Sequence, residues 1–241
     1  MNILQRFSAP KLQWVALICL LVYPIAILAA RLDIWHFRNS FLLFVIAALI
    51  GFGVLVVSVL KLAKSQEGEA KPLVVALIAT AIPLGLLGSS IMKAQSHPFI
   101  HDITTDTQTP PEFVAAKADR AEGDHDVAYA GDAIASLQRE GYPDLTSVTL
   151  SHSPPQVFEL AKGLVQTNGW ALLAENNQQL PYTLEAVDTS LLFGFKDDVV
   201  IRINEGENGS IVDVRSMSRQ GKSDLGVNAK RIRTFLEQLS K

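Results

Sequence analysis

The sequence predicts three transmembrane helices followed by an α+β domain, in which an antiparallel sheet packs against two helices in two layers. Three observations lead to this prediction. Three long stretches within the first 96 residues contain no charged side chain. Between residues 145 and 218, short segments of alternating apolar residues are joined by short turns. Two further segments carry apolar side chains at helical spacing, one near residue 160 and one at the carboxy terminus.

The uncharged stretches predict a membrane domain of residues 1–96, with spans at about 14–30, 39–60 and 72–92. The runs between flanking basic residues are 19, 22 and 21 residues long. At about 1.5 Å per helical residue, each covers roughly 28–33 Å, enough to cross a bilayer core. The spans contain no ionisable side chain of the kind that ion-coupled transporters use. Small residues such as Ala47 and Gly51 instead favour helix packing.

The distribution of basic residues predicts the orientation of the spans. The amino-terminal tail and the second loop together carry Arg6, Lys11, Lys61, Lys64 and Lys71. The other side carries Arg31, Arg38 and Lys93. The excess of positive charge predicts a cytoplasmic amino terminus, and therefore a periplasmic carboxy-terminal domain on a bacterial inner membrane.

An alternative interpretation makes residues 1–30 a cleaved signal peptide. The basic start and the apolar run fit this, but residues 27–30 lack a small-x-small cleavage pattern. Cleavage would leave two spans and the same external domain.

The composition of residues 97–241 excludes several classes of protein. This part has 13 Lys and Arg residues against 21 Asp and Glu residues, so it repels nucleic-acid phosphates, and we expect no nucleic-acid partner. The only cysteine, Cys19, lies in the first apolar run, which excludes a disulfide scaffold. No nucleophile elbow, phosphate loop or zinc-protease motif occurs. We therefore expect no cofactor, and the question of catalysis stays open.

The external domain begins with a polar segment. Residues 97–144 are expected to form an extended strap, because Pro98, Pro110 and Pro111 prevent a long helix. A short helix is possible at Tyr129–Glu140, with Ile134 and Leu137 on one face.

Residues 145–241 are the predicted core of the domain. A strand is expected at Leu145–Ser151. Ser153, Pro154 and Gln156 then form a helix start, and Asn168–Gly169 ends that helix. Its predicted apolar stripe consists of Val157, Leu160, Ala161 and Leu164.

Four strands and a helix complete the predicted core. Strands are expected at Trp170–Glu175, Tyr182–Asp188, around Val199–Ile203 and at Ile211–Ser218, with a hairpin turn at Glu205–Gly209. The apolar stripe of the last helix consists of Leu225, Ile232, Phe235, Leu236 and Leu239. This order of elements is similar to the helix-grip arrangement, in which a curved sheet wraps a terminal helix.

One group of residues in the strap has side chains that bind metals. His97, His101, Asp102 and Asp106 combine imidazole and carboxylate groups. Their spacing does not fit a calcium loop. We expect no metal here, and we expect the Asp and Thr side chains to satisfy backbone amides of the strap.

A second group suggests an anion site. Arg215 and Arg219 precede a helix start that Ser223 or Asp224 can cap, and free amides at a helix start attract anions. The predicted ligand-binding residues are Arg215, Arg219, Ser223, Asp224, Asn228, Asp102 and Asp106. In the alternative interpretation, Arg215 and Arg219 pair with Asp213, Asp224 or Asp106 and only hold the loop. Lys230, Arg231 and Arg233 are expected on a solvated helix face.

Three segments carry a family resemblance. They read HDITTDTQTPPEF from His101, then Gln138 with YPDL from Tyr142, and RSMSRQGKSDLGVNAKRI from Arg215. Together they resemble the bacterial family of unknown-function domains numbered 1499, over roughly residues 97–241. Such domains often follow a few membrane spans, and no established activity comes with the resemblance.

The resemblance selects a set of residues: His101, Asp102, Thr105, Asp106, Arg215, Ser218, Arg219, Ser223, Asp224, Gly226 and Asn228. We predict that the two long motifs meet in space, with Asp102 or Asp106 against Arg215 or Arg219.

The predicted function is that of a multi-pass inner-membrane protein with an external binding or accessory domain. Its expected partners are the lipid bilayer and either a lipid or small anionic molecule or another membrane protein. Two alternatives stay open: a metal-dependent hydrolase acting at the envelope through His101, Asp102 and Asp106, and a structural subunit of a membrane complex.

Overall fold

The computed structural model describes residues 7–32 and 34–241, and the chain divides into two compact units. The first unit ends at Lys93 and also includes Leu192–Gly194. The second contains Ala94–Leu191 and Phe195–Lys241. Arg6, which counts toward the predicted orientation, lies outside the described residues.

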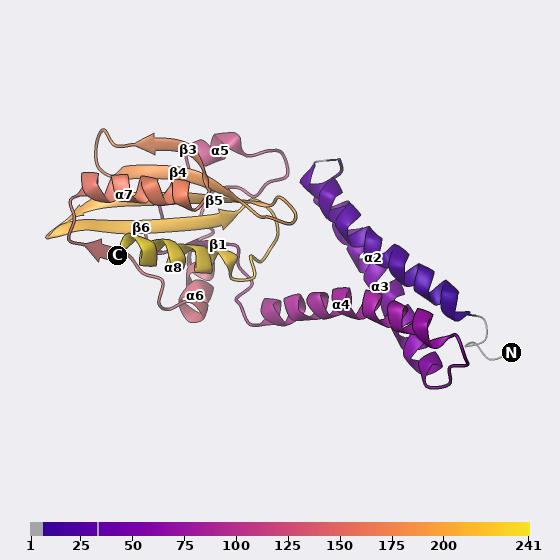
Figure 1. Ribbon diagram of the computed structural model, residues 1–241. Coiled ribbons are helices and arrows are strands. Elements are labelled where there is room, and N and C mark those ends of the chain that lie inside the picture. The colour runs from indigo at the N-terminus through magenta and orange to yellow at the C-terminus, as the bar shows by residue number, and fades with distance from the viewer. Residues whose placement is uncertain (1–6, 33) are drawn as a thin grey trace. The chain divides into compact units, whose positions relative to one another are not determined.

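Three long helices make up most of the first unit: α2 (Ala9–Arg31), α3 (Phe37–Leu62) and α4 (Ala70–Gln95) (Figure 1). By length and composition, all three are able to cross a membrane. Each contains one of the predicted spans. Pro24 and Pro83 lie inside α2 and α4, where neither ends its helix.

Small residues and internal hydrogen bonds define the packing of these helices. Ala47 and Gly51 are both buried, and a Cβ atom on Gly51 would lie 3.7 Å from the side chain of Thr80. The buried hydroxyl of Ser40 donates to the carbonyl oxygen of Ala26 at 2.7 Å. Small side chains allow close helix contact, and such hydrogen bonds satisfy polar groups that lipid cannot.

The second unit is built on an open antiparallel sheet. Its strands are β1 (Asp102–Thr104), β2 (Val148–Leu150), β3 (Ala171–Asn176), β4 (Tyr182–Thr189), β5 (Lys196–Gly206) and β6 (Gly209–Ser218). They follow the order β1-β6-β5-β4-β3, and β2 also pairs with β6. All pairings are antiparallel, which confirms the predicted α+β class.

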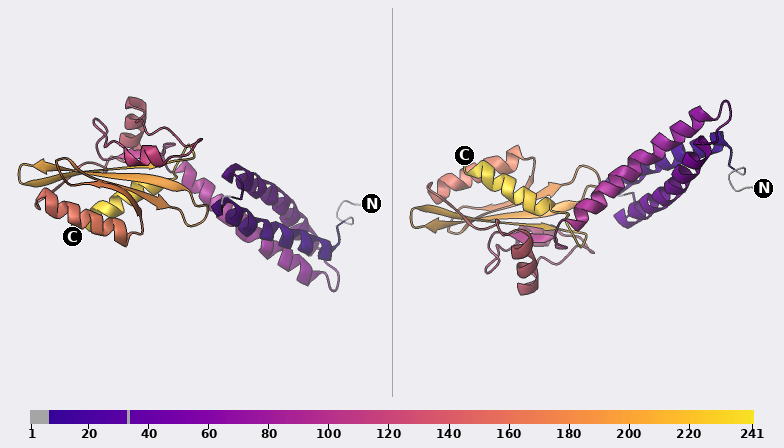
Figure 2. Two further views of the ribbon diagram at one scale, coloured as in Figure 1. Left: turned by 90° about the horizontal axis from the view of Figure 1, so that it is seen from above. Right: turned by 90° about the horizontal axis from the view of Figure 1, so that it is seen from below.

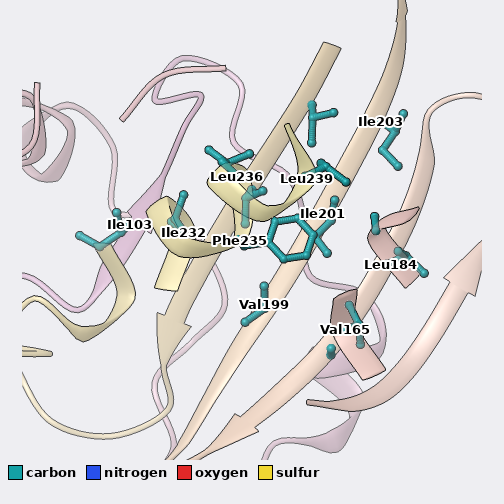
Figure 3. Packing of buried hydrophobic residues seen from close by; sticks show 14 of the residues in the cluster. Ile103, Val165, Leu184, Val199, Ile201, Ile203, Ile232, Phe235, Leu236 and Leu239 are labelled. Carbon is teal, nitrogen blue, oxygen red and sulfur yellow. The ribbon is translucent and has the colours of Figure 1, made fainter. Parts of the chain in front are cut away.

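Four helices accompany the sheet: α5 (Ala115–Asp119), α6 (Asp132–Gly141), α7 (Pro154–Thr167) and α8 (Val227–Leu239). Helices α7 and α8 lie on one face, and α5 and α6 lie on the other (Figure 2). The main hydrophobic core fills the space between the sheet and the α7/α8 layer (Figure 3). Val199, Ile201 and Ile203 of β5 point into this core, as their alternation predicts.

The local signals read from the sequence are confirmed at α7. Ser153 is the residue before the helix, and its backbone N–H donates to Oε1 of Gln156 at 3.1 Å. Gly169 follows the helix with a φ of 73°, in the left-handed region. The hairpin turn between β5 and β6 is also present, and its last pair joins Gly206 to Gly209.

The segment 97–144 contains more regular structure than an extended strap. It contributes β1 to the sheet as well as helices α5 and α6. A three-residue strand has no readable alternation, so only its pairing with β6 defines it. The segment also contributes Ile100, Ile103 and Tyr142 to the main core.

Three predicted helix faces need correction. In α6 the buried side chains are Ala135 and Gln138, whereas Leu137 is exposed. The reason is a polar contact, because Gln138 exchanges two hydrogen bonds with the backbone of Thr104. In α7, Leu160 is exposed and Phe158 and Val165 are buried instead. Leu225 precedes α8 and is also exposed.

Candidate functional site

The two faces of the sheet differ in chemistry. One face packs the apolar core, and the opposite face of β5 and β6 carries Asp198, Arg202, Asp213 and Arg215. Segment 105–131, which includes α5, covers this second face (Figure 2). We call these charged side chains and their partners the charged layer. It contains five of the eleven residues that the sequence motifs single out: Asp102, Thr105, Asp106, Arg215 and Arg219.

Arg215 and Asp102 form the central ion pair of the charged layer. Arg215 donates from Nε to Oδ1 of Asp102 at 2.9 Å and from Nη2 to Oδ2 at 2.8 Å. Both residues are buried. This confirms the predicted meeting of the two motifs, which lie on the neighbouring antiparallel strands β1 and β6.

The remaining contacts of Arg215 enclose its guanidinium group. It donates to the carbonyl oxygens of Pro111 at 3.0 Å and Val127 at 2.7 Å. The rings of Phe113 and Tyr129 lie 4.7 and 5.4 Å from its Cζ atom. Carbonyl oxygens and aromatic faces both stabilise a cation. In this arrangement Arg215 holds the strap on the sheet rather than facing solvent.

Arg219 belongs to a second cluster, centred on Asp198. The Asp198 carboxylate is fully buried and accepts from Arg219 Nη2 at 2.7 Å and from Arg120 Nε at 2.9 Å. Arg219 also donates to Asp119 at 2.8 Å. Burial alone would lower the pKa of Arg219, but its two carboxylate partners raise it. This guanidinium therefore stays charged and joins β6, β5 and the strap.

Asp106 pairs with Arg202 rather than with Arg215 or Arg219. Nη2 of Arg202 lies 2.9 Å from Asp106 Oδ2 and 2.8 Å from Asp213 Oδ2. Asp106 also accepts from the backbone of Gln108 and from the backbone and hydroxyl of Thr109. Burial would raise its pKa, but these hydrogen bonds outweigh it and lower the pKa to about 2. Asp106 is thus ionised, and its pair with Arg202 holds the strap to β5.

Glu185 on β4 binds the start of α5. This buried carboxylate accepts from the backbone N–H groups of Val114, Ala115 and Ala116, at 2.9–3.1 Å. A carboxylate at a helix start satisfies amides that have no partner within the helix. The sequence offered no signal for this contact, since its partners lie about 70 residues apart.

The other residues of the predicted anion site lie at the start of α8. Asp224 accepts from the backbone N–H groups of Gly226 at 3.1 Å and Asn228 at 2.6 Å. It thus binds an amide of the first turn of α8, but the N-cap residue is Gly226 rather than Ser223 or Asp224. Burial raises the pKa of the Asp224 carboxyl. Ser223 accepts from the backbone of Leu225. Asn228 is fully buried, and its side-chain amide donates to the carbonyl oxygen of His101 at 3.0 Å.

The structure does not bring the four candidate metal ligands together. Asp102 and Asp106 belong to separate ion pairs. The ring of His101 stacks on His125 at 4.2 Å, and the ring of His97 lies edge-on to Tyr142 at 6.4 Å. Within residues 7–32 and 34–241, no group of three or more His, Cys, Asp or Glu side chains is arranged to hold a metal ion.

Arg231 lies in a polar cluster with 7% of its side chain exposed, so the predicted solvated face of α8 is wrong at this position. Its Nη2 atom lies 2.8 Å from Asp188 and 2.6 Å from Asp197. It also donates to Ser216 at 2.9 Å. Arg233 pairs with Asp144 at the surface. The acid partners of Arg231, Asp188 and Asp197, were not predicted, because only the folded sheet places β4 and β5 beside α8.

Two hollows lie on the domain surface. The first, of about 250 Å³, lies beside α8; its lining residues are Asn168, Trp170, Asp188, Val227, Lys230, Arg231, Thr234 and Phe235. We call it the α8 pocket. The second, of about 580 Å³, lies between the strap around Pro110 and the β3–β4 hairpin around Leu180, with Glu185 and Arg202 in its lining.

The comparisons with known proteins bear on the domain as a whole. No curated protein and no solved structure matches the chain. A family model described as a protein of unknown function, DUF1499, matches residues 102–239. The match begins at β1 and ends at the last residue of α8, so it spans all six strands. It covers more than half of the chain, and the protein belongs to the DUF1499 family.

Proposed function

We propose that this protein is a multi-pass inner-membrane protein whose periplasmic domain binds an anionic lipid or a small anionic amphiphile in the α8 pocket. The observation that carries the proposal is that aromatic and basic side chains line the same pocket. Trp170 and Phe235 are among its lining residues, with their rings stacked at 5.5 Å, and both are largely buried in the main core. Lys230 and Arg231 also line it.

An exposed cation at the α8 pocket can receive an anionic group. Arg231 is paired with two carboxylates, Asp188 and Asp197, which together outweigh its charge by one. Lys230 is exposed and lines the pocket, so it is the cation that an anionic group would approach. An amphiphile with an acyl or ring portion can lie on Trp170 and Val227 while its anionic group approaches Lys230. The ligand class therefore remains the one expected from the sequence, but Arg215 and Arg219 take structural roles in this arrangement.

The short connection between α4 and the sheet favours a lipid as the ligand. Helix α4 ends at Gln95 and β1 begins at Asp102, so six residues connect them. Even fully extended, this connection spans only about 25 Å. If α4 crosses the bilayer, the domain stays beside the membrane surface. The excess of basic residues in the amino-terminal tail and second loop supports a cytoplasmic amino terminus, with the domain on the periplasmic side.

Native mass spectrometry of the full-length protein, released from detergent, tests the binding proposal. We expect the wild type to retain phosphatidylglycerol in preference to phosphatidylcholine, and Lys230→Glu to lose this preference. Lys162→Glu is the matched control, because Lys162 lies on α7 in an ion pair with Glu175. Lipids bound to the membrane helices affect both variants equally. Equal retention by the two variants would contradict the proposal.

A water-soluble competitor tests whether the pocket binds a lipid or a free phosphate compound. Glycerol 3-phosphate has the headgroup chemistry without acyl chains. If it displaces the bound lipid at millimolar concentration, the pocket selects the phosphate. If it does not, apolar contacts in the pocket supply most of the affinity, as expected for a lipid site.

A second candidate function is docking of another membrane protein. Strand β3 ends the strand order of the sheet, and the 580 Å³ hollow lies beside its hairpin. An edge strand offers backbone groups for pairing with another chain. A photocrosslinker at Leu172, which is 38% exposed on β3, tests this function. One defined crosslinked partner at this position, absent with the crosslinker at Asn208, would favour it.

A further inference from the structure

Exposed apolar side chains occur together in the loop between β4 and β5. Residues 190–195 of this loop read SLLFGF and contain no charge. Leu191 is 82% exposed and Leu192 is 58% exposed. Single exposed apolar residues are ordinary on a protein surface, but several in one uncharged loop indicate an interaction site.

Two further exposed apolar residues occur in neighbouring connections. Phe99 lies between α4 and β1 and is 69% exposed. Leu225 lies between β6 and α8 and is 40% exposed. Its φ of 54° is in the left-handed region, which is unfavourable for leucine. Because the Leu225 side chain is exposed, burial in the core does not offset this backbone strain. This suggests that the side chain has a role outside the core of the domain.

The sheet register places these connections at one end of the sheet. Thr189 pairs with Lys196 at the base of the β4–β5 loop. Asp197 pairs with Ser218, the last residue of β6, and Asp102 at the start of β1 pairs with Met217. The β4–β5 loop, the β6–α8 connection and the entry of the chain from α4 therefore share this end (Figure 1). We call it the entry end.

Charged groups at the entry end favour a lipid surface. Lys196 and Lys222 are exposed and flank the apolar loops. The carboxylates on the strands at this end, Asp102, Asp188, Asp197 and Asp198, all form ion pairs with arginines, and all but Asp188 are buried. Apolar side chains between exposed lysines match the interface of a bilayer. The acyl region accommodates the apolar side chains, and the anionic headgroups attract the lysines.

We propose that the entry end of the domain inserts Leu191, Leu192, Leu225 and Phe99 into the surface of the bilayer, with Lys196 and Lys222 among the headgroups. The occupant is the bilayer because the six-residue connection enters the sheet at this same end and follows a helix long and apolar enough to cross it. The inference rests on the proposed function only in that α4 anchors the domain to a membrane.

Spin-label depth measurements on the full-length protein test this insertion. In a Cys19→Ser background, a nitroxide is attached to Leu192→Cys, and the protein is placed in vesicles of phosphatidylethanolamine and phosphatidylglycerol. The matched control is Asn208→Cys in the β5–β6 turn, at the opposite end of the sheet. We expect the Leu192 label to be relaxed mainly by oxygen, and the Asn208 label mainly by a water-soluble nickel complex. Equal relaxation of both labels by nickel overturns the proposal.

A second variant tests whether the loop holds the entry end in the lipid. With the nitroxide at Leu225→Cys, the changes Leu191→Glu and Leu192→Glu should raise nickel accessibility several-fold, since a charged loop leaves the acyl region. A Leu192 label that is immobilised and shielded from both oxygen and nickel would indicate a protein surface, and would also overturn the proposal.

The periplasmic location is tested separately from insertion. A membrane-impermeant thiol reagent added to intact spheroplasts should modify Asn208→Cys if the domain is external. Absence of modification would contradict the proposed location, while the depth measurement in vesicles would still decide insertion. The Lys230→Glu variant tests only the α8 pocket. Its result, whichever way it falls, does not change what the spin labels say about insertion.

Discussion

Arg215 and Asp102 form an ion pair with two hydrogen bonds, which joins the last strand of the sheet to the first strand after the three long apolar helices. Both partners are buried, and carbonyl oxygens from the strap complete the coordination of the guanidinium. The pair therefore fixes where the chain enters the domain. Similar pairs, Arg120 with Asp198 and Arg202 with Asp106, hold the rest of the strap.

Removal of one partner of this pair should strongly destabilise the domain. We expect Asp102→Asn or Arg215→Met to lower the free energy of unfolding by about 3–5 kcal/mol, because a buried charge is left without its partner. The double variant should lose less than the sum of the single variants. Urea unfolding of the full-length protein, followed by near-UV circular dichroism, measures these changes.

The exposed pair of Arg233 and Asp144 provides the control. Its side chains are 36% and 54% exposed, so Arg233→Met should cost less than about 1 kcal/mol. Equal losses at the buried and exposed pairs would contradict a structural role for the charged layer.

The stacked pair of His101 and His125 should make stability depend on pH. Burial lowers the pKa of His101, and the nearby His125 and Arg120 act in the same direction, while Asp102 opposes them. The folded state therefore binds a proton less readily than the unfolded chain, whose histidine pKa is about 6.5. The neutral form is favoured on folding, so stability should fall as the pH decreases below about 6.5.

Thermal unfolding of the wild type and of His101→Gln between pH 5 and 8 measures this dependence. The variant should show a flatter profile, and the gap between the two should change mainly below pH 6.5. Parallel profiles over the whole range would show that His101 does not titrate on unfolding.

Asp106 should contribute to stability only while it is ionised. Its hydrogen bonds hold the pKa at about 2 in the folded state, below the ordinary value of 3.8. The contribution is present above pH 3.8 and is lost as the pH falls toward 2. Acid titration followed by tryptophan fluorescence should therefore show a smaller loss of stability between pH 4 and 2 in Asp106→Asn than in the wild type. An identical acid transition in both proteins would exclude this role.

Two glycines in the domain should respond to substitution in opposite directions. A Cβ atom on Gly209 would lie 2.0 Å from the carbonyl oxygen of Leu150, and its φ of 145° is unfavourable for alanine. Gly209→Ala should therefore distort the β5–β6 hairpin and lower the melting temperature. Gly163 lies inside α7 with open space around it, so Gly163→Ala should stabilise by roughly 0.5–1 kcal/mol. Scanning calorimetry on both variants checks the signs.

Local patterns in the sequence were sufficient for most elements of secondary structure. Uncharged runs with basic flanks predicted α2, α3 and α4, because the length of an apolar helix follows directly from composition. Helix α7 and the β5–β6 hairpin were also predicted. Their signals, the cap at Ser153 and the turn around Asn208, lie within a few residues of the structure they specify.

The pairing of the motif residues was only partly predicted, for a physical reason. The motifs around Asp102 and Arg215 were expected to meet, and they do. The partners of Arg219, Asp106 and Arg231 could not be predicted, since each pairing depends on which strands lie side by side and which face each side chain occupies.

The sequence by itself therefore determined the three long apolar helices, the α+β class and the family, because these depend on composition, periodicity and motifs along the chain. Only the tertiary structure decided that β1 joins the sheet, that the arginines of the motifs form a buried charged layer, and that exposed apolar loops share the entry end. Long-range pairing brings together residues about 100 positions apart, and no local pattern encodes the choice of partner.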